Sequence, residues 1–212
     1  MLMLVSDSND MQNLERFKQT YGLRDCDVIL IPYGSRVYQT HSVKSDYDYI
    51  AIVLENRRAD TGTEYNYDDL NVQVYNRRDF QDQLNQHKIH ALEAWFHPDK
   101  QLSCDFQFKL RLSLLRDSIS GKSSHSFVKA KKKIEVEHDY LIGWKSLFHS
   151  LRILNFGIQI ASFGDISDFG STNMYWEEII NEKLTDWSLL HERYKPVYNA
   201  FATEFRKLAP KE

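Results

Sequence analysis

The sequence has few cysteines, no excess of positive charge and no long hydrophobic run, and each of these shortages excludes a class of protein. Its 212 residues include two cysteines, Cys26 and Cys104, which do not form a paired motif. We therefore expect a reducing compartment, with neither a disulfide framework nor a zinc site. Lys and Arg total 27 against 30 Asp and Glu, for a net charge of −3. This charge argues against nucleic-acid binding through overall positive charge and leaves room for a local basic groove.

Two further absences concern the membrane and the destination of the chain. No apolar run is long enough to span a bilayer. The first residues, MLMLVSDSND, lack the basic n-region of a signal peptide. We therefore expect a cytoplasmic protein without membrane association, and the sequence gives no indication of its oligomeric state.

The apolar pattern changes along the chain from strand-like to helical. Strands are predicted over 28–31, 46–54 and 70–75, with a polar loop over 56–69. Helical spacing of apolar residues predicts helices over 11–21, 78–84, 88–96, 106–119, 124–133, 138–163, 174–181 and 187–208. Strands followed by helices favour an α+β fold over alternating β and α units.

The motif with the clearest chemical meaning joins a glycine–serine turn to two acids. Gly34 and Ser35 follow the first predicted strand, and Asp46 and Asp48 follow after a ten-residue gap. Residues two apart in a strand share a face, so the two carboxylates are expected side by side. Such a pair is costly unless a cation joins them, and oxygen ligands suit Mg²⁺ or Mn²⁺. The turn allows the backbone to approach a phosphate closely.

Taken alone, an Asp-x-Asp pair is more often a solvated pair at a strand start, and a Gly-Ser pair an ordinary turn. The combination of strand, turn and spacing favours a metal and phosphate site. The string GSRVYQTHSVKSDYDYIAIV resembles the Gly-Ser/Asp-x-Asp signature of the DNA polymerase β-like nucleotidyltransferase superfamily. It is most similar to small bacterial and phage predicted nucleotidyltransferases with a suggested link to RNA repair. The segments YNRRDFQDQLNQHKIHALEAWF and KSLFHSLRIL are also similar to that subgroup.

This resemblance implies a small mixed β-sheet core with helices packed on it over residues 1–100, and a helical region over 101–212 that completes the cleft. It implies a nucleoside triphosphate substrate, Mg²⁺ or Mn²⁺, and transfer of a nucleotidyl group to a hydroxyl. RNA ends are the favoured acceptor, with a protein or a small molecule as alternatives. The expected metal ligands are Asp46 and Asp48. The expected nucleotide-binding residues are Gly34, Ser35, Arg36, Ser45, Lys145, His149 and Arg152.

The superfamily implies a third catalytic acid on a neighbouring strand, and here the sequence departs from the pattern. The strand LNVQVYN presents Asn71 and Gln73 on its polar face. An amide cannot take a proton and is a weaker cation ligand than a carboxylate. Asp69 lies two residues before Asn71 and would share its strand face, so it is the leading candidate for the third acid. Glu93 is another candidate. Otherwise the site works with two acids, or catalysis is lost.

Basic residues gather in two helical segments. Lys145, His149 and Arg152 share one helix face and are candidates for gripping a triphosphate or a polynucleotide backbone. The run 129–133 holds four lysines, which are more often a solvated surface than a phosphate site. Two rival functions remain open. One is a non-catalytic module that binds a nucleotide, RNA or a partner protein, and the other is a component of a toxin–antitoxin pair.

Overall fold

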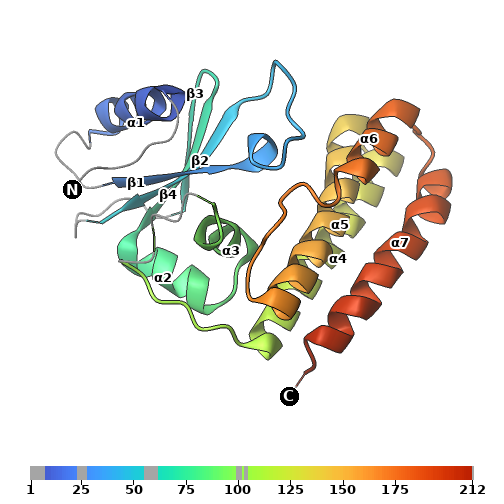
Figure 1. Cartoon of the computed structure of the whole chain (residues 1–212). Helices are drawn as coiled ribbons and strands as arrows, with labels where there is room; N and C mark the ends of the chain where they lie inside the picture. The colour runs from blue at the N-terminus through green and yellow to red at the C-terminus, as the bar shows by residue number, and fades with distance from the viewer. Residues whose placement is uncertain (1–7, 23–27, 55–61, 99–101, 103–104, 212) are drawn as a thin grey trace. The chain divides into compact units, whose positions relative to one another are not determined.

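The computed structural model describes residues 8–22, 28–54, 62–98, 102 and 105–211. Cys26 and Cys104 lie outside them. The fold is α+β and divides into two compact units, residues 1–85 with 93–108 and residues 86–92 with 109–212 (Figure 1). Compared with the expected boundary at residue 100, the first unit extends to residue 108 and the short segment 86–92 groups with the later helices.

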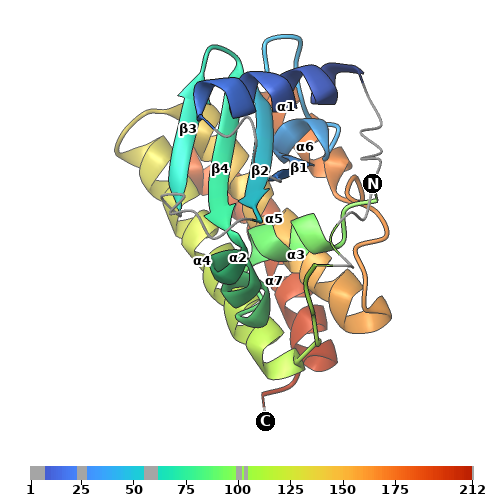
Figure 2. The ribbon, with the colours of Figure 1, turned by 90° about the vertical axis from the view of Figure 1, so that its left-hand side faces the viewer.

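The first unit is built on a four-stranded mixed sheet in the order β1-β2-β4-β3 (Figure 2). β1 pairs with β2 in antiparallel fashion, β2 runs parallel to β4, and β3 pairs with β4 in antiparallel fashion. The strands are β1 (Val28–Tyr33), β2 (Tyr47–Val53), β3 (Thr63–Tyr67) and β4 (Leu70–Asn76). A short 3-10 turn, η1 (Gly34–Arg36), follows β1 directly.

One face of the sheet is covered by the N-terminal helix α1 (Ser8–Thr20). Phe17 of α1 packs against alternate residues of three strands, because side chains two apart in a strand share a face. Buried Asn13 also donates from Nδ2 to the Tyr49 hydroxyl at 3.0 Å. The strand residues of this apolar face are Val28, Leu30, Tyr49, Ala51, Val53, Leu70, Val72 and Val74.

The intervening residues therefore project from the opposite face of the sheet. Asp48 of β2 and Asn71 of β4 are register partners on that face. The structure also places β3 within the segment expected to be a loop over 56–69, of which residues 56–61 are not described. Its sequence, TEYNY, is almost wholly exposed. An edge strand held by backbone pairing needs no apolar face, so the hydrophobic pattern missed it.

Two short helices follow the sheet. α2 (Arg77–Asn85) is capped reciprocally by Asn76 and Asp79. Asn76 Oδ1 accepts from the Asp79 N–H at 2.8 Å, and Asn76 Nδ2 donates to Asp79 Oδ2 at 2.7 Å. α3 (Ile89–Trp95) begins in the second unit and ends in the first.

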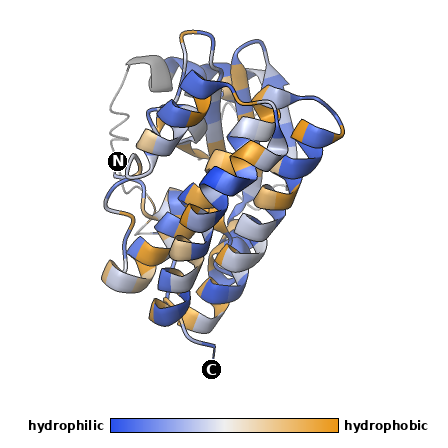
Figure 3. Ribbon diagram, turned by 90° about the vertical axis from the view of Figure 1, so that its right-hand side faces the viewer, coloured by the Kyte–Doolittle hydropathy of each residue, from blue (hydrophilic) through white to orange (hydrophobic). Residues whose placement is uncertain are grey.

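The second unit is helical. Its helices are α4 (Leu112–Glu135), α5 (Tyr140–Phe163), α6 (Asn173–Glu182) and α7 (Trp187–Leu208). The two helices expected over 106–119 and 124–133 form the single helix α4. Serines rather than large apolar residues occupy part of its buried face, at Ser123 and Ser126. Hydrophilic and hydrophobic residues alternate along these helices (Figure 3).

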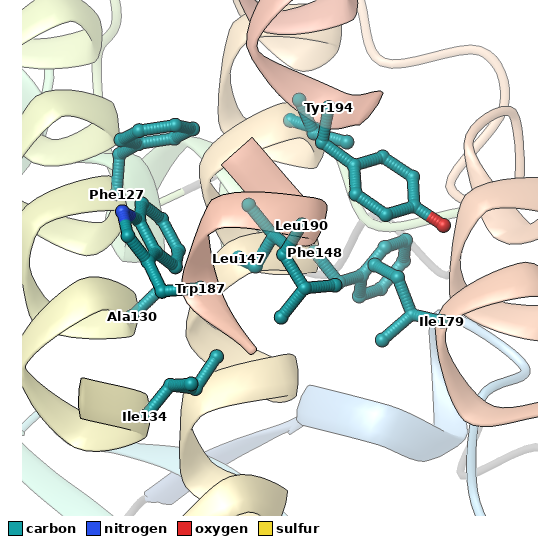
Figure 4. Close-up of a cluster of buried hydrophobic side chains, with 10 residues drawn as sticks. Phe127, Ala130, Ile134, Leu147, Phe148, Ile179, Trp187, Leu190 and Tyr194 are labelled. Atoms are coloured by element: carbon teal, nitrogen blue, oxygen red, sulfur yellow. The ribbon is translucent and has the colours of Figure 1, made fainter. Parts of the chain in front are cut away.

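An aromatic and aliphatic core holds α4, α5, α6 and α7 together. Leu147 and Phe148 of α5 pack with Ile179 of α6 and with Leu190 and Tyr194 of α7 (Figure 4). The helices also approach closely at glycines. A β-carbon on Gly157 would lie 2.7 Å from Ile119 Cγ2 of α4 and 2.9 Å from Phe205 Cε2 of α7. None of the helices in the described part of the chain combines the length and apolar character needed to cross a membrane.

Candidate functional site

The two motif acids lie together where β2 begins, joined by an amide from β4. Asp46 comes one residue before β2 and is exposed, and Asp48 is half-buried within it. Asn71 Nδ2 donates to Asp46 Oδ2 at 3.3 Å and to Asp48 Oδ1 at 3.2 Å. Because one nitrogen reaches both side chains, the carboxylates are neighbours on one face of the sheet. Strand alternation indicated that the two acids share a face, but it did not indicate the bridge through Asn71.

The glycine of the motif is packed against the second acid. Gly34 has φ +77°, in the left-handed region that favours glycine. A β-carbon there would overlap Asp48 Oδ2 and lie within 2.9 Å of its Cβ and Cγ. Asp48 thus occupies the space that any other residue at position 34 would need. The turn and the acid pair form one local structure, and Ser35 lies half-buried beside them.

Arg36 holds the main chain that leads into the acid pair. Its Nη2 donates to the Ser45 carbonyl at 2.7 Å and its Nε to the Asp46 carbonyl at 3.3 Å. Its guanidinium carbon lies 3.8 Å from the ring centroid of Tyr47. The hydroxyl of Ser45 accepts from the Ser42 N–H at 2.9 Å. In this structure, therefore, Arg36 and Ser45 organise the loop before the acids, and Lys44 is exposed within it.

Asp69, the leading candidate for the third acid, is drawn toward α1 instead. Its Oδ1 lies 3.3 Å from Arg16 Nη1, and its carbonyl accepts from the Tyr47 N–H at 2.7 Å. Asp69 lies in the turn before β4, after Asp68 at φ +51°. The position of Asp69 two residues before Asn71 did not indicate this pairing with Arg16. Asn71 takes the bridging position.

The other two candidates on the first unit have different partners. Glu93 is a buried residue of α3, and its Oε2 accepts from the buried Tyr38 hydroxyl at 2.5 Å. Tyr38 in turn donates its backbone N–H to the Gly34 carbonyl at 3.2 Å. Glu93 is thereby connected to the motif turn through Tyr38. Gln73 is half-buried on β4, with its Oε1 3.5 Å from the Tyr75 hydroxyl.

Lys145, His149 and Arg152 belong to α5 of the second unit, where they run from exposed to buried. Lys145 is exposed, His149 half-buried and Arg152 buried. Arg152 Nη2 lies 2.6 Å from His149 Nδ1, and its guanidinium lies over the rings of Phe148 and Phe156. Burial, followed by the charges of Arg152, Lys122 and Lys129, holds the pKa of His149 well below its usual range.

Sequence reasoning found the two acids and the glycine, but it missed three partners that define the site. Arg16 is 53 residues from Asp69 and Tyr38 is 55 residues from Glu93, so no local pattern indicated these two contacts. Asn71 was noticed as the place where an acid was expected, but not as a bridge. Among the described residues, no group of three or more His, Cys, Asp or Glu side chains is placed to hold a metal ion. No protein-family model matches the chain, and no curated protein matches it either.

Proposed function

We propose that this chain transfers a nucleotidyl group from a nucleoside triphosphate to a hydroxyl acceptor in a reaction that depends on a divalent metal. The observation that carries the proposal is the Asp46–Asn71–Asp48 bridge, set against Gly34 at the end of β1. Two neighbouring carboxylates, one of them packed against the turn, supply oxygen ligands beside a backbone that can approach phosphates. The resemblance of the signature to that of nucleotidyltransferases supports the same chemistry.

The donor set fits a magnesium or manganese ion. Asp46 and Asp48 offer carboxylate oxygens, and a half-turn of the Asn71 amide replaces its N–H donor with its oxygen. Mg²⁺ usually takes one or two carboxylates, with water and substrate phosphates completing the shell. When bound, such an ion neutralises the triphosphate and activates the attacking hydroxyl. Two acids and an amide are enough protein ligands for this purpose.

The residues of the chain have distinct roles in the transfer. Gly34 lets the backbone of η1 approach the triphosphate, and the Ser35 hydroxyl donates to a phosphate oxygen. The acceptor oxygen bonds to the α-phosphorus as the bond to the bridging oxygen breaks and pyrophosphate leaves. Asn71 has no basic lone pair for the released proton. The exposed carboxylate of Asp46 takes it, while Asp48 stays fixed against Gly34.

The class of acceptor follows from the resemblance rather than from the geometry. RNA ends are favoured, and protein side chains and small molecules remain as alternatives. The test incubates the purified protein with labelled triphosphates, Mg²⁺ and a transfer-RNA pool, and repeats the assay with protein and small-molecule hydroxyl acceptors. The variant carrying Asp46→Asn and Asp48→Asn should lose the label transfer. A control with Asp82→Asn and Asp117→Asn, both exposed, should keep it. Absence of transfer to every class of acceptor, or transfer that survives loss of both acids, would refute the proposal.

A second candidate is a nucleotide-binding module without turnover. The Asn71 amide favours it, because its N–H group satisfies both carboxylates with no ion present. Calorimetry with a triphosphate, with and without Mg²⁺, separates the two functions. Binding that is independent of the metal and leads to no product indicates the module.

A further inference from the structure

Six basic side chains from three segments of the second unit form what we call the basic cluster. Its members are Lys88, His90, Lys122, Lys129, His149 and Arg152. Lys122 and Lys129 both act on His149, and Lys122 also acts on His90 together with Lys88. Three segments separated in sequence therefore place cations within electrostatic reach of the two histidines, with Lys122 acting on both.

Helix packing explains how α4 and α5 contribute to the basic cluster. Ser123 of α4 donates to the Ser150 carbonyl of α5 at 2.8 Å, in a buried contact. The residues immediately before these serines are Lys122 and His149. Lys129 lies two helical turns after Lys122, so it is on the same side of α4. Both lysines are exposed.

The segment that carries Lys88 and His90 is fixed to the start of α4. Buried His87 accepts through Nε2 from the Arg111 N–H at 2.9 Å. This contact holds the chain just before Lys88. His90, one residue into α3, is half-buried. Burial and then the charges of Lys122 and Lys88 lower its pKa to about 4.

The contact with Arg152 determines which ring nitrogen of His149 carries the proton. A guanidinium only donates, so His149 Nδ1 accepts the 2.6 Å bond from Arg152 Nη2. The neutral ring therefore carries its proton on Nε2, on the side away from Arg152. This leaves the Nε2–H of His149 as a hydrogen-bond donor.

The neighbouring lysines of α4, unlike Lys122 and Lys129 of the basic cluster, form ion pairs with acidic residues in the described part of the chain. Lys131 pairs with Glu135 at 3.6 Å, and Lys132 pairs with Glu137 at 3.0 Å. Lys133 pairs with both Glu137 and Asp139. Within the lysine run 129–133, the three later lysines are each paired with an acid, whereas Lys129 acts on His149 of the basic cluster.

We propose that the basic cluster binds phosphate groups, supplied by a single-stranded polynucleotide backbone or by the triphosphate of a nucleotide. Exposed lysines provide mobile point charges for phosphate, and the Nε2–H of His149 provides a directed donor. A bound phosphate relieves the mutual repulsion of the cations. All six residues belong to the second unit. This proposal therefore does not depend on whether Asp46 and Asp48 catalyse nucleotidyl transfer.

The test uses the full-length protein and two probes: a fluorescein-labelled single-stranded RNA oligonucleotide and inorganic tripolyphosphate. Lys122→Ala with Lys129→Ala should weaken binding about tenfold and lower the slope of log K against log salt by about two. The matched control, Lys131→Ala with Lys132→Ala, removes the same charge from paired lysines and should change little. Proton NMR titration should show the pKa of His90 rising from about 4 when tripolyphosphate is bound.

The two probes distinguish the source of the phosphate. Tight binding of RNA that tripolyphosphate displaces only weakly identifies a polynucleotide backbone as the ligand. Comparable binding of both probes identifies the nucleotide triphosphate. The proposal is overturned if the wild-type protein binds neither probe, or if the control variant weakens binding as much as the Lys122 and Lys129 variant does.

Discussion

The carboxylate of Asp48 fills the position where a side chain at residue 34 would begin, so Gly34 and Asp48 are packed as a pair. The left-handed backbone of Gly34, at φ +77°, makes this contact possible. Residue 34 must therefore both adopt a positive φ and leave space for Asp48.

Gly34→Ala should abolish the proposed nucleotidyl transfer, because the added methyl group displaces Asp48 from the bridge with Asn71. Left-handed backbone costs about 1–2 kcal/mol for a residue other than glycine. Gly62→Ala is the matched control, since Gly62 has φ +78° and no atom within 4 Å of the added carbon. Urea unfolding should show that the strained backbone destabilises both variants. Label transfer should show that only Gly34→Ala loses activity. Equal activity in the two would contradict the pairing.

Asn71→Asp places a third carboxylate between the other two. Without metal, the loss of two hydrogen bonds to charged groups and the added repulsion should lower the free energy of unfolding by about 2–4 kcal/mol. Millimolar Mg²⁺ should restore most of that loss, and Mn²⁺ affinity measured by calorimetry should rise. Asn199→Asp, at an exposed position of α7, is the control and should do neither. Unchanged Mn²⁺ affinity in Asn71→Asp would place the metal elsewhere.

The lowered pKa of His90 predicts an acid-dependent loss of stability. In the unfolded chain His90 takes up a proton near pH 6.5, whereas in the folded protein it does so at about pH 4. Between these values the unfolded state binds more protons, so stability falls as the pH falls from about 6.5 to 4. Burial and the charges of Lys122 and Lys88 cause the shift. Urea unfolding should therefore show a shallower pH dependence for His90→Gln than for the wild type, and parallel curves would rule this out.

Two glycines on adjacent helices should respond to the same substitution with opposite signs. Gly157→Ala forces a methyl group against Ile119 and Phe205, and should cost about 1–3 kcal/mol of unfolding free energy. Gly121→Ala, on exposed α4 surface with nothing within 4 Å, should instead stabilise by about 0.5–1 kcal/mol. Thermal unfolding measures both. In a double-mutant cycle, Ile119→Ala should cost less stability in the Gly157→Ala background than in the wild type; equal costs would mean that the contact is relieved elsewhere.

The sequence predicted the α+β fold and the neighbourhood of Asp46, Asp48 and Asn71, because strand alternation is a local rule. The sequence did not predict features that depend on contacts between residues far apart in the chain. β3 carries no apolar pattern and is held by pairing with β4. The sequence did not indicate that Arg16 of α1 holds the carboxylate of Asp69, which follows the turn at Asp68. Glu93 was noticed, but its link to Gly34 through Tyr38 depends on a contact across 55 residues.

The parallel pairing of β2 with β4 has a consequence for the order of assembly. Asp48 belongs to the antiparallel pair β1–β2, whereas Asn71 belongs to the antiparallel pair β3–β4. Each two-stranded ribbon is marginal in isolation, and only the central seam between them unites the acids with the amide. We expect the contact between Asp48 and Asn71 to mature late in refolding, when the ribbons dock, so a partly folded chain would retain secondary structure before it acquires the site.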